Sequence, residues 1–424
     1  MERKYGATSQ QTSSVTFGKK WAQGETDIMN PFYKKQLLFN ISNIIKYDRR
    51  TGVHRVTRGL LSALFQNTPK NWLIRPIYGD VDRKGFFYAN KMLRETWGFK
   101  EFPAKDIPVS YNIGDIFLGG IDFSPEVDFA QEKELLQMQQ QGVNLYFMVY
   151  DLIPIFFPQY CPVPLHEIFP RWLYYIMQFD GAICDSQAVK KDLQIWMYEH
   201  VPHRLKHFSL SWFHLGGDIE QSIPSTDIPS EASFAFRQMK ERPTVLMVGR
   251  VDPRKGHRQV FAAFESLWQQ NVDINLVIAG RQGWDMEATE ALFVQHPEQG
   301  KRLFRLKDIS DEYLTAVYTA STVILMASEA EGFGLPIVEA ARHKKPLILR
   351  DLPVFREIAG DHAFYFRGIE PSRLANAINH WLSLNAEGRA PSTEGMKILT
   401  WKESAQMLLD RLLEDAKHHQ GERA

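Results

Sequence analysis

The chain has little cysteine, no excess of charge of either sign and no long apolar run. Only Cys161 and Cys184 occur among its 424 residues, so no disulfide framework is implied and reduced cytoplasmic thiols are expected. Basic and acidic residues number 50 each, and this balance argues against a nucleic-acid-binding protein. No apolar run approaches the roughly 18 residues of a membrane span, and we expect no secretory signal in the polar N-terminal residues.

The composition and length predict a globular protein of two domains. Hydrophobic residues make up 44% and charged residues 24% of the chain, as in ordinary globular proteins, and 424 residues exceed one ordinary core. A stretch rich in Ser and Pro, followed by charged residues, indicates an interdomain linker at 221–242. We therefore expect a poorly ordered segment, an N-terminal domain, this linker, a C-terminal domain and a terminal helix, at 1–30, 31–220, 221–242, 243–395 and 396–424.

Both halves have the apolar pattern of parallel α/β domains, in which strands alternate with helical stretches. In the first half, the apolar runs predict strands at 36–41, 72–78, 115–118, 145–150 and 181–186. In the second half, they predict strands at 244–250, 276–280, 322–326 and 346–349. Apolar residues at helical spacing predict a helix opened by a loop that ends at Gly52 and a last helix from about Trp401, and a further helix is expected from about Gln187.

Glu331 and Glu339 flank a glycine-rich turn between a buried strand and a helix that begins near Pro336. Proline suits the first turn of a helix, and the free N–H groups there can bind an anion such as a diphosphate. One glutamate could bind sugar hydroxyls and the other ribose hydroxyls, although such turns are also common in α/β proteins that bind no nucleotide. The residues between them that would approach the donor are Gly332, Phe333, Gly334 and Leu335.

Arg250 and Lys255 lie in the loop that follows the first strand of the second half. Ligands of open α/β sheets bind at the carboxyl ends of the strands, where such a cationic pair could neutralise a diphosphate. A solvated basic loop is the alternative, and the independent prediction of an anion site at 331–339 weighs against it.

Three further segments of the first half are candidates. Gly52 opens a helix within a basic cluster that could meet a phosphate or an anionic lipid; the alternative is an ordinary helix start with an exposed basic face. Asp151 follows the fourth strand and could act as acid or base, or simply cap a helix. Asp80-Val81-Asp82 has the form of a metal-binding motif, but we expect chance and no metal. The basic cluster comprises Arg49, Arg50, His54, Arg55 and Arg58.

With these residues in view, the chain resembles the retaining glycosyltransferases of family 4, which have the two-domain GT-B fold. The segment 331–339 resembles the family's paired-glutamate signature, 249–256 its phosphate-binding Arg/Lys segment, and 51–55 its N-terminal glycine loop. In its sequence details, including the stretch 150–154, the chain most resembles bacterial mannosyltransferases of O-antigen and other surface polysaccharides. Many relatives carry His-Asp where this chain has Tyr150-Asp151, so Tyr150, His54 or His214 could contact the transferred sugar instead.

The resemblance implies two Rossmann-like, doubly wound domains facing across a cleft, with the C-terminal helix packing back on the N-terminal domain. It implies transfer of a hexose, with retention, from a nucleotide sugar to a glycan hydroxyl. Glu331, Arg250, Lys255 and Asp151 would be catalytic, while Glu339, the 332–335 turn and Gly52 would bind the donor. The expected donor is GDP-mannose, with no cofactor or metal, since positioning and electrostatic stabilisation of the leaving diphosphate suffice.

Several alternatives remain open at this point. The donor could be a UDP-sugar, because the base contacts that we expect from loops 281–284 and 305–310 are not decoded. A nucleotide-sugar epimerase or a degenerate, non-catalytic module would share the fold. If the acceptor is a polyprenyl-diphosphate-linked glycan, the protein would work in the cytoplasm at the inner face of the membrane. The candidate peripheral membrane contacts are the basic cluster and Trp172, Tyr174, Tyr175 and Phe179.

Overall fold

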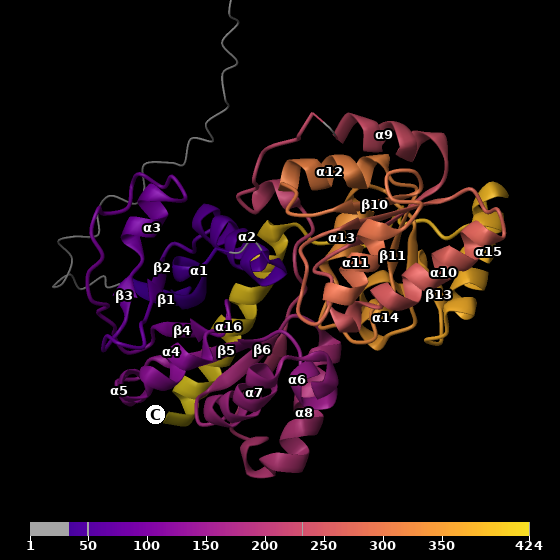
Figure 1. Ribbon diagram of the computed structural model, residues 1–424. Coiled ribbons are helices and arrows are strands. Elements are labelled where there is room, and N and C mark those ends of the chain that lie inside the picture. Colours follow the sequence, from indigo (N-terminus) through magenta and orange to yellow (C-terminus); the bar gives the residue numbers. More distant parts are fainter. Residues whose placement is uncertain (1–33, 49–50, 231, 424) are drawn as a thin grey trace, which may run out of the picture.

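The computed structural model describes residues 34–48, 51–230 and 232–423. It contains two sheets of mainly parallel strands that lie in separate halves of the molecule, each with helices packed around it (Figure 1). The predicted N-terminal segment at 1–30 and the cationic side chains of Arg49 and Arg50 lie outside the described residues. The α/β fold class expected from the sequence is confirmed.

The N-terminal sheet has seven strands in the order β3-β2-β1-β4-β5-β6-β7. All neighbours are parallel except β3, which pairs antiparallel with β2 at the edge. Strand β5 is buried along its whole length, which explains its uninterrupted apolar sequence. The strands are β1 (Lys35–Asn40), β2 (Trp72–Tyr78), β3 (Phe87–Tyr88), β4 (Ile116–Gly119), β5 (Asn144–Val149), β6 (Gly181–Cys184) and β7 (Ser209–Trp212).

The helices of this half connect its strands. They are α1 (Ser42–Lys46), α2 (Gly52–Gln66), α3 (Asn90–Glu95), α4 (Pro125–Ala130), α5 (Glu132–Gln140), α6 (Ile153–Phe156), α7 (Val163–Ile176) and α8 (Gln187–His200), with short 3-10 turns η1 (Pro158–Tyr160), η2 (Pro202–Arg204) and η3 (Ile219–Gln221). Two of the predicted helices begin directly after an N-cap residue. The Thr51 hydroxyl accepts a hydrogen bond from His54 N before α2, and Ser186 Oγ accepts one from Val189 N before α8.

The C-terminal sheet has six parallel strands in the order β10-β9-β8-β11-β12-β13. Its strands are β8 (Thr244–Val248), β9 (Asn275–Ala279), β10 (Leu303–Leu306), β11 (Val323–Met326), β12 (Leu347–Arg350) and β13 (Phe364–Phe366). Its helices are α9 (Ala232–Glu241), α10 (His257–Gln269), α11 (Glu287–Gln295), α12 (Asp311–Ala320), α13 (Leu335–Arg342), α14 (Pro353–Ala359) and α15 (Pro371–Ala386), with turns η4 (Pro253–Lys255) and η5 (Gly360–His362).

Helix α16 (Trp401–Arg423) returns from the C-terminal half to the N-terminal half, where it packs against α2, β5 and β7 (Figure 1). Its first residue, Trp401, is buried, and its backbone N–H donates to Asp218 Oδ1 at 2.6 Å. Gly59 and Gly216 make room for the indole, since a Cβ on either would lie within 2.5 Å of a Trp401 atom. The C-terminal helix therefore packs as the resemblance implied.

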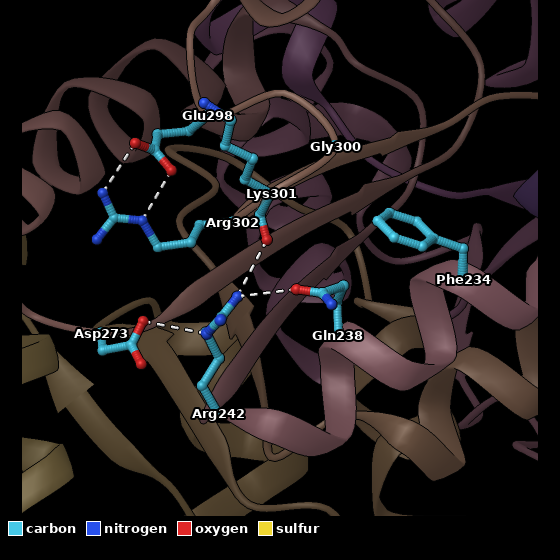
Figure 2. Close-up of a pocket in the computed structure, with 8 residues that line it drawn as sticks. All are labelled: Phe234, Gln238, Arg242, Asp273, Glu298, Gly300, Lys301 and Arg302. Carbon is cyan, nitrogen blue, oxygen red and sulfur yellow. Dashed lines mark hydrogen bonds and ion pairs between the residues drawn. The ribbon is translucent and has the colours of Figure 1, made fainter.

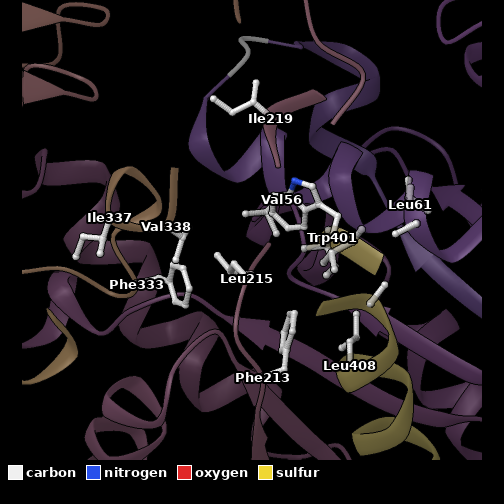
Figure 3. Close-up of a cluster of buried hydrophobic side chains, with 14 of the residues drawn as sticks. Val56, Leu61, Phe213, Leu215, Ile219, Phe333, Ile337, Val338, Trp401 and Leu408 are labelled. Carbon is white, nitrogen blue, oxygen red and sulfur yellow. The ribbon is translucent and has the colours of Figure 1, made fainter. Parts of the chain in front are cut away.

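One apolar cluster joins the two halves. It includes Val56 of α2, Leu215 and Ile219 after β7, Val338 of α13, and Trp401 of α16, all buried (Figure 3). Burial of apolar side chains from both sheets in one core stabilises their relative position by the hydrophobic effect.

The sequence missed four strands: β3, β7, β10 and β13. Strands β3 and β13 have only two and three residues, and polar residues interrupt the apolar runs of β7 and β10. The predicted linker at 221–242 contains helix α9 in its second half, and this helix packs against α12 of the C-terminal domain.

Candidate active site

The two candidate donor segments follow neighbouring strands. Strand β8 pairs in parallel with β11, so the loop at 249–256 and the loop at 327–334 leave the same edge of the sheet. Gly256 has φ of 73°, and a Cβ there would lie 2.3 Å from Ala327 O, so only glycine permits this approach. The topology therefore brings the predicted basic loop against the paired-glutamate loop.

Glu331 lies between two cations. One carboxylate oxygen contacts Lys255 Nζ and accepts a hydrogen bond from Ser328 Oγ at 2.8 Å, and the other lies 2.8 Å from an Arg254 guanidinium nitrogen. Burial alone would raise the pKa of this carboxyl, but the charges of Arg254 and Lys255 outweigh burial and lower its pKa to about 2. Glu331 is thus a fixed anion beside two fixed cations.

The two predicted cations of the 249–256 loop have different surroundings. The Lys255 side chain is only 14% exposed, and burial lowers its pKa despite the nearby Glu331 charge. The Arg250 side chain is 55% exposed, and its Nε donates to both oxygens of Asp252, at 2.9 and 2.8 Å. Arg254, which the sequence analysis did not select, is the arginine that contacts Glu331.

The glycine turn after Glu331 is pressed against the N-terminal domain. A Cβ on Gly332 would lie 1.8 Å from Tyr150 O and 3.2 Å from Asp151 Cβ, and Ser186 Oγ donates to Gly332 O at 2.7 Å. Gly334 caps α13 with φ of 93°, a left-handed conformation that favours glycine. The close contact with the N-terminal domain thus explains the glycine at 332, and the left-handed backbone conformation explains the glycine at 334.

Asp151, which is partly buried, and Asp185, which is buried, carry carboxyls at the ends of β5 and β6. Burial raises the pKa of both; the Arg254 charge opposes the shift at Asp151, whereas the charge of Asp151 adds to it at Asp185. Asp151 Oδ1 accepts the Ile153 N–H at 3.0 Å, so the helix-capping alternative describes one of its contacts. A carboxyl with a raised pKa beside a fixed anion is suited to hold or accept a proton.

Glu339 is held by both domains. The side chain is 2% exposed; one oxygen contacts Arg55 of α2, and the other accepts the Tyr318 hydroxyl at 2.7 Å. Gly52, at the start of the same helix α2, faces Leu335, where a Cβ would lie 3.7 Å from Leu335 Cδ1. The predicted glycine loop and the 331–339 segment are therefore neighbours.

The three residues that could replace the histidine of the family's His-Asp pair have different surroundings. The Tyr150 hydroxyl donates to Ile121 O at 2.6 Å, within its own domain. His54 belongs to α2 and is 4% exposed, with Nδ1 3.4 Å from Asp48 Oδ1. His214 is partly exposed: its Nε2 lies 2.7 Å from Glu357 Oε1, and its ring lies 5.8 Å from that of Phe333. Of the two histidines, His214 is the one beside the glycine turn.

Part of the predicted membrane surface is wrong. Trp172 and Phe179 are 1% and 0% exposed and pack in the core of the N-terminal domain, Trp172 on the buried face of α7 and Phe179 in the turn that follows this helix. Arg58 is also buried, bonded to Asp48 and to Ser222 O, and Arg55 contacts carboxylates of the other domain. Neither arginine forms the exposed basic face that a lipid head group would need.

The described residues contain neither a cluster of three or more His, Cys, Asp and Glu side chains placed for a metal nor a helix long and apolar enough to cross a membrane. Asp80, the first carboxylate of the metal-like motif, instead pairs with Lys46 Nζ at 3.1 Å. A separate open pocket lies at α9 and the amino-terminal ends of β9 and β10 (Figure 2). It is lined by Phe234, Gln238, Arg242, Asp273, Glu298, Gly300, Lys301 and Arg302, none of which the candidate site uses.

Sequence reasoning missed Arg254, Asp311 and Glu357. Glu357 of α14 accepts the backbone N–H groups of Gln187 and Ala188 at the start of α8, at 2.7 and 2.8 Å, and also binds His214. Arg254 lies next to Lys255 in the loop predicted to bind phosphate, so its position in that loop could have identified it. The other two act across the domain boundary, which no local pattern reveals.

The two Rossmann-like sheets, the return of α16 and the loops facing across the domain boundary define a GT-B fold. Residues 230–397 match the family described as "Glycosyl transferases group 1". The C-terminal half of the chain therefore matches a family of glycosyltransferases.

Among curated proteins, the chain is similar to the "Serotype-specific mannosyltransferase WbdA" of Escherichia coli. The two are 36% identical over 403 residues, which cover 93% of this chain and 47% of that protein. The chain thus spans about half the length of the curated relatives that it matches over most of its length. A shorter similarity, 27% identity over 34% of this chain and 40% of the relative, links it to the "O-antigen chain mannosyltransferase RfbU" of Salmonella typhimurium.

Solved structures agree on the architecture. Anabaena Alr3699/HepE in complex with UDP-glucose superposes with a TM-score of 0.57 at 16% identity, covering 91% of this chain and 99% of that chain. A UDP-forming trehalose-phosphate synthase from Burkholderia xenovorans gives a TM-score of 0.53 at 17% identity, covering 72% and 73%. At these identities the comparison establishes the fold.

Proposed function

We propose that the protein is a retaining glycosyltransferase that moves mannose from GDP-mannose to a hydroxyl of a lipid-linked glycan in bacterial surface polysaccharide synthesis. The observation that carries this proposal is the Glu331 carboxylate, held by Arg254 and Lys255 in the loop before α13. The next residue, Gly332, packs against Tyr150 and Asp151 of the other domain. The similarity to proteins named as mannosyltransferases supports the sugar.

In this proposal the donor diphosphate lies against the cationic loop and the N-terminus of α13. Lys255, Arg250 and the free N–H groups of the helix would stabilise the negative charge that develops on the leaving diphosphate. Glu331 would orient sugar hydroxyls, and Glu339 would bind the ribose. No metal is required, because fixed cations of the chain supply the field.

Asp151 would serve the acceptor side of the cleft. Because burial raises its pKa, this carboxyl is a better proton acceptor than an exposed aspartate would be. The acceptor hydroxyl would attack the anomeric carbon on the face from which the diphosphate leaves, so the configuration is retained. Positioning and electrostatics carry most of the catalysis, since no protein nucleophile is needed.

The nucleobase would be read by two loops that lie together. Arg281 Nε lies 2.6 Å from Asp308 Oδ1, which links the predicted base-contact loops at 281–284 and 305–310. Trp284 Nε1 donates to Tyr160 O at 3.1 Å, which ties the first of these loops to the N-terminal domain. These contacts support a base site at the rim of the donor pocket.

The deciding experiment is calorimetric binding of GDP-mannose, UDP-glucose and UDP-N-acetylglucosamine to the purified protein, with and without a chelator. Selective, chelator-insensitive binding of GDP-mannose is expected. Preference for a UDP-sugar would retain the glycosyltransferase but overturn the mannose donor. Sugar transfer from the bound donor to a polyprenyl-diphosphate-linked glycan in vesicles, with analysis of the anomeric configuration, tests the acceptor, the inner-membrane setting and retention. Binding of no nucleotide sugar would contradict the proposal.

A further inference from the structure

Arg55 extends from α2 of the N-terminal domain to two carboxylates of the C-terminal domain. One guanidinium nitrogen contacts Glu339 of α13 and another contacts Asp311 at the start of α12. The exposed fractions of the three side chains are 15%, 2% and 8%, so solvent screens these contacts little. The ion pair therefore joins the domains at the nucleoside side of the proposed donor site.

Every oxygen of the two carboxylates has a partner in this network. The second oxygen of Glu339 accepts the Tyr318 hydroxyl at 2.7 Å, and the second oxygen of Asp311 accepts Ser225 N and Oγ at 2.9 and 3.0 Å. Burial by itself would lower the pKa of Arg55, but Glu339 and Asp311 outweigh it and raise that pKa. Arg55 is thus a permanent cation that fixes both carboxylates.

We propose that Arg55 is a positioning residue that completes the donor site from the opposite domain by fixing the orientation of Glu339. This inference rests on the proposed function, in which Glu339 binds the ribose. Glu339 then has its binding orientation only when the domains are closed, so nucleotide affinity and domain closure depend on each other. A ribose hydroxyl would bind to a carboxylate that Arg55 and Tyr318 already hold in place.

The geometry requires an arginine. A guanidinium presents several N–H donors in a rigid plane and can contact two carboxylates at once, whereas a lysine ammonium is a flexible point charge. Arg55→Lys therefore keeps the charge and removes the bridge. Arg171→Lys is the matched control, because Arg171 is exposed and its guanidinium lies over the Phe129 ring at 5.6 Å, away from the proposed site.

The test measures the dissociation constants of GDP and UDP, and kcat and KM for the donor, in the wild type, Arg55→Lys and Arg171→Lys. We expect Arg55→Lys to weaken binding of the preferred nucleotide about tenfold and to raise the donor KM. Loss of one hydrogen bond that orients a binding group changes affinity by a factor of about this size. The acceptor KM and the Arg171→Lys constants should stay at wild-type values. Unchanged nucleotide affinity in a folded Arg55→Lys protein would overturn the inference.

Tyr318→Phe provides a second variant if Arg55→Lys does not fold. It removes the other hydrogen bond that orients Glu339 without removing a charge, and we expect the donor KM to rise while the acceptor KM stays constant. Equal donor KM values for Tyr318→Phe and the wild type would contradict the positioning role. Failure of the wild type to bind either nucleotide would instead overturn the proposed function together with this inference, so the two failures are distinguishable.

Discussion

Asp128 in the N-terminal domain and Glu331 in the C-terminal domain are both buried carboxyls, yet their pKa values shift in opposite directions. Burial raises the pKa of Asp128 to about 7, and the neutral Trp172 N–H, 2.8 Å from Oδ2, does not offset that shift. The same burial at Glu331 is outweighed by Arg254 and Lys255, and its pKa falls to about 2. The partner, and not the depth of burial, decides whether a buried carboxyl is charged at neutral pH.

This difference separates a carboxyl inside one domain from the carboxyl of the proposed active site. Asp128 joins α4 to α7 inside one domain, where burial favours its neutral form. Glu331 lies where two domains meet, and its charge is kept by cations that the proposed reaction also needs. Buried ion pairs are weak evidence for stability, so the paired site is better explained by function.

The largest expected effect comes from removing the charge of Glu331. Glu331→Gln leaves Arg254 and Lys255 without their counter-charge and frees both to reorient. We expect transfer to fall by about 10²- to 10³-fold, as for loss of a group that stabilises a transition state, and the melting temperature to fall as well. Steady-state kinetics and calorimetry measure both. Glu312→Gln, at an exposed glutamate on α12, is the control, and near-normal transfer by Glu331→Gln would refute the assignment.

A smaller but specific effect should follow Gly332→Ala. The added Cβ would meet Tyr150 O at 1.8 Å, so the glycine turn must withdraw from the N-terminal domain. We expect at least tenfold slower transfer, because small displacements of reacting groups are costly, and a larger radius of gyration by small-angle X-ray scattering. Gly300→Ala, where a Cβ has open space although φ is 75°, controls for backbone strain alone. A compact, fully active Gly332→Ala protein would show that this contact is dispensable.

The pH dependence of stability tests the comparison at Asp128. Its folded pKa lies above the ordinary value of 3.8, so its contribution is complete below about 3.8 and is lost as the pH rises to about 7. Asp128→Asn should therefore gain unfolding free energy relative to the wild type between pH 5 and pH 8. Glu331 has the opposite sign and acts at lower pH, its contribution being lost as the pH falls from 4.5 toward about 2. Urea denaturation at each pH measures the difference; a constant difference between pH 5 and 8 would mean that Asp128 does not titrate there.

The smallest effect is expected for Tyr150→Phe. This change removes the hydrogen bond to Ile121 O and should lower the unfolding free energy by about 1 kcal/mol. Because the hydroxyl already donates within its own domain, we expect transfer to change by less than about threefold, a difference under 1 kcal/mol in the barrier. Loss of transfer by 100-fold in a folded variant would show that the hydroxyl contacts the sugar.

Local sequence determined much of this protein. The apolar runs at 72–78 and 145–150 predicted β2 and β5 to within a residue, and Gly52, Gln187 and Trp401 begin helices as predicted. The loops containing Lys255 and Glu331 were also identifiable from the sequence. Glycine and proline indicate a turn and a helix start there, and the charged residues beside them indicate an anion site. Short strands such as β3 and β13 gave no comparable signal, since two or three residues do not establish a period.

Only the tertiary structure decided which residues meet. It brought Arg254 to Glu331, Arg55 to Glu339 and Asp311, and Tyr150 against Gly332, and it buried Trp172, which the sequence had offered as a membrane contact. Arg55 and Glu339 are 284 residues apart in the chain. A sequence period reports which face of an element is apolar, but the partner across a domain boundary depends on how two whole domains pack.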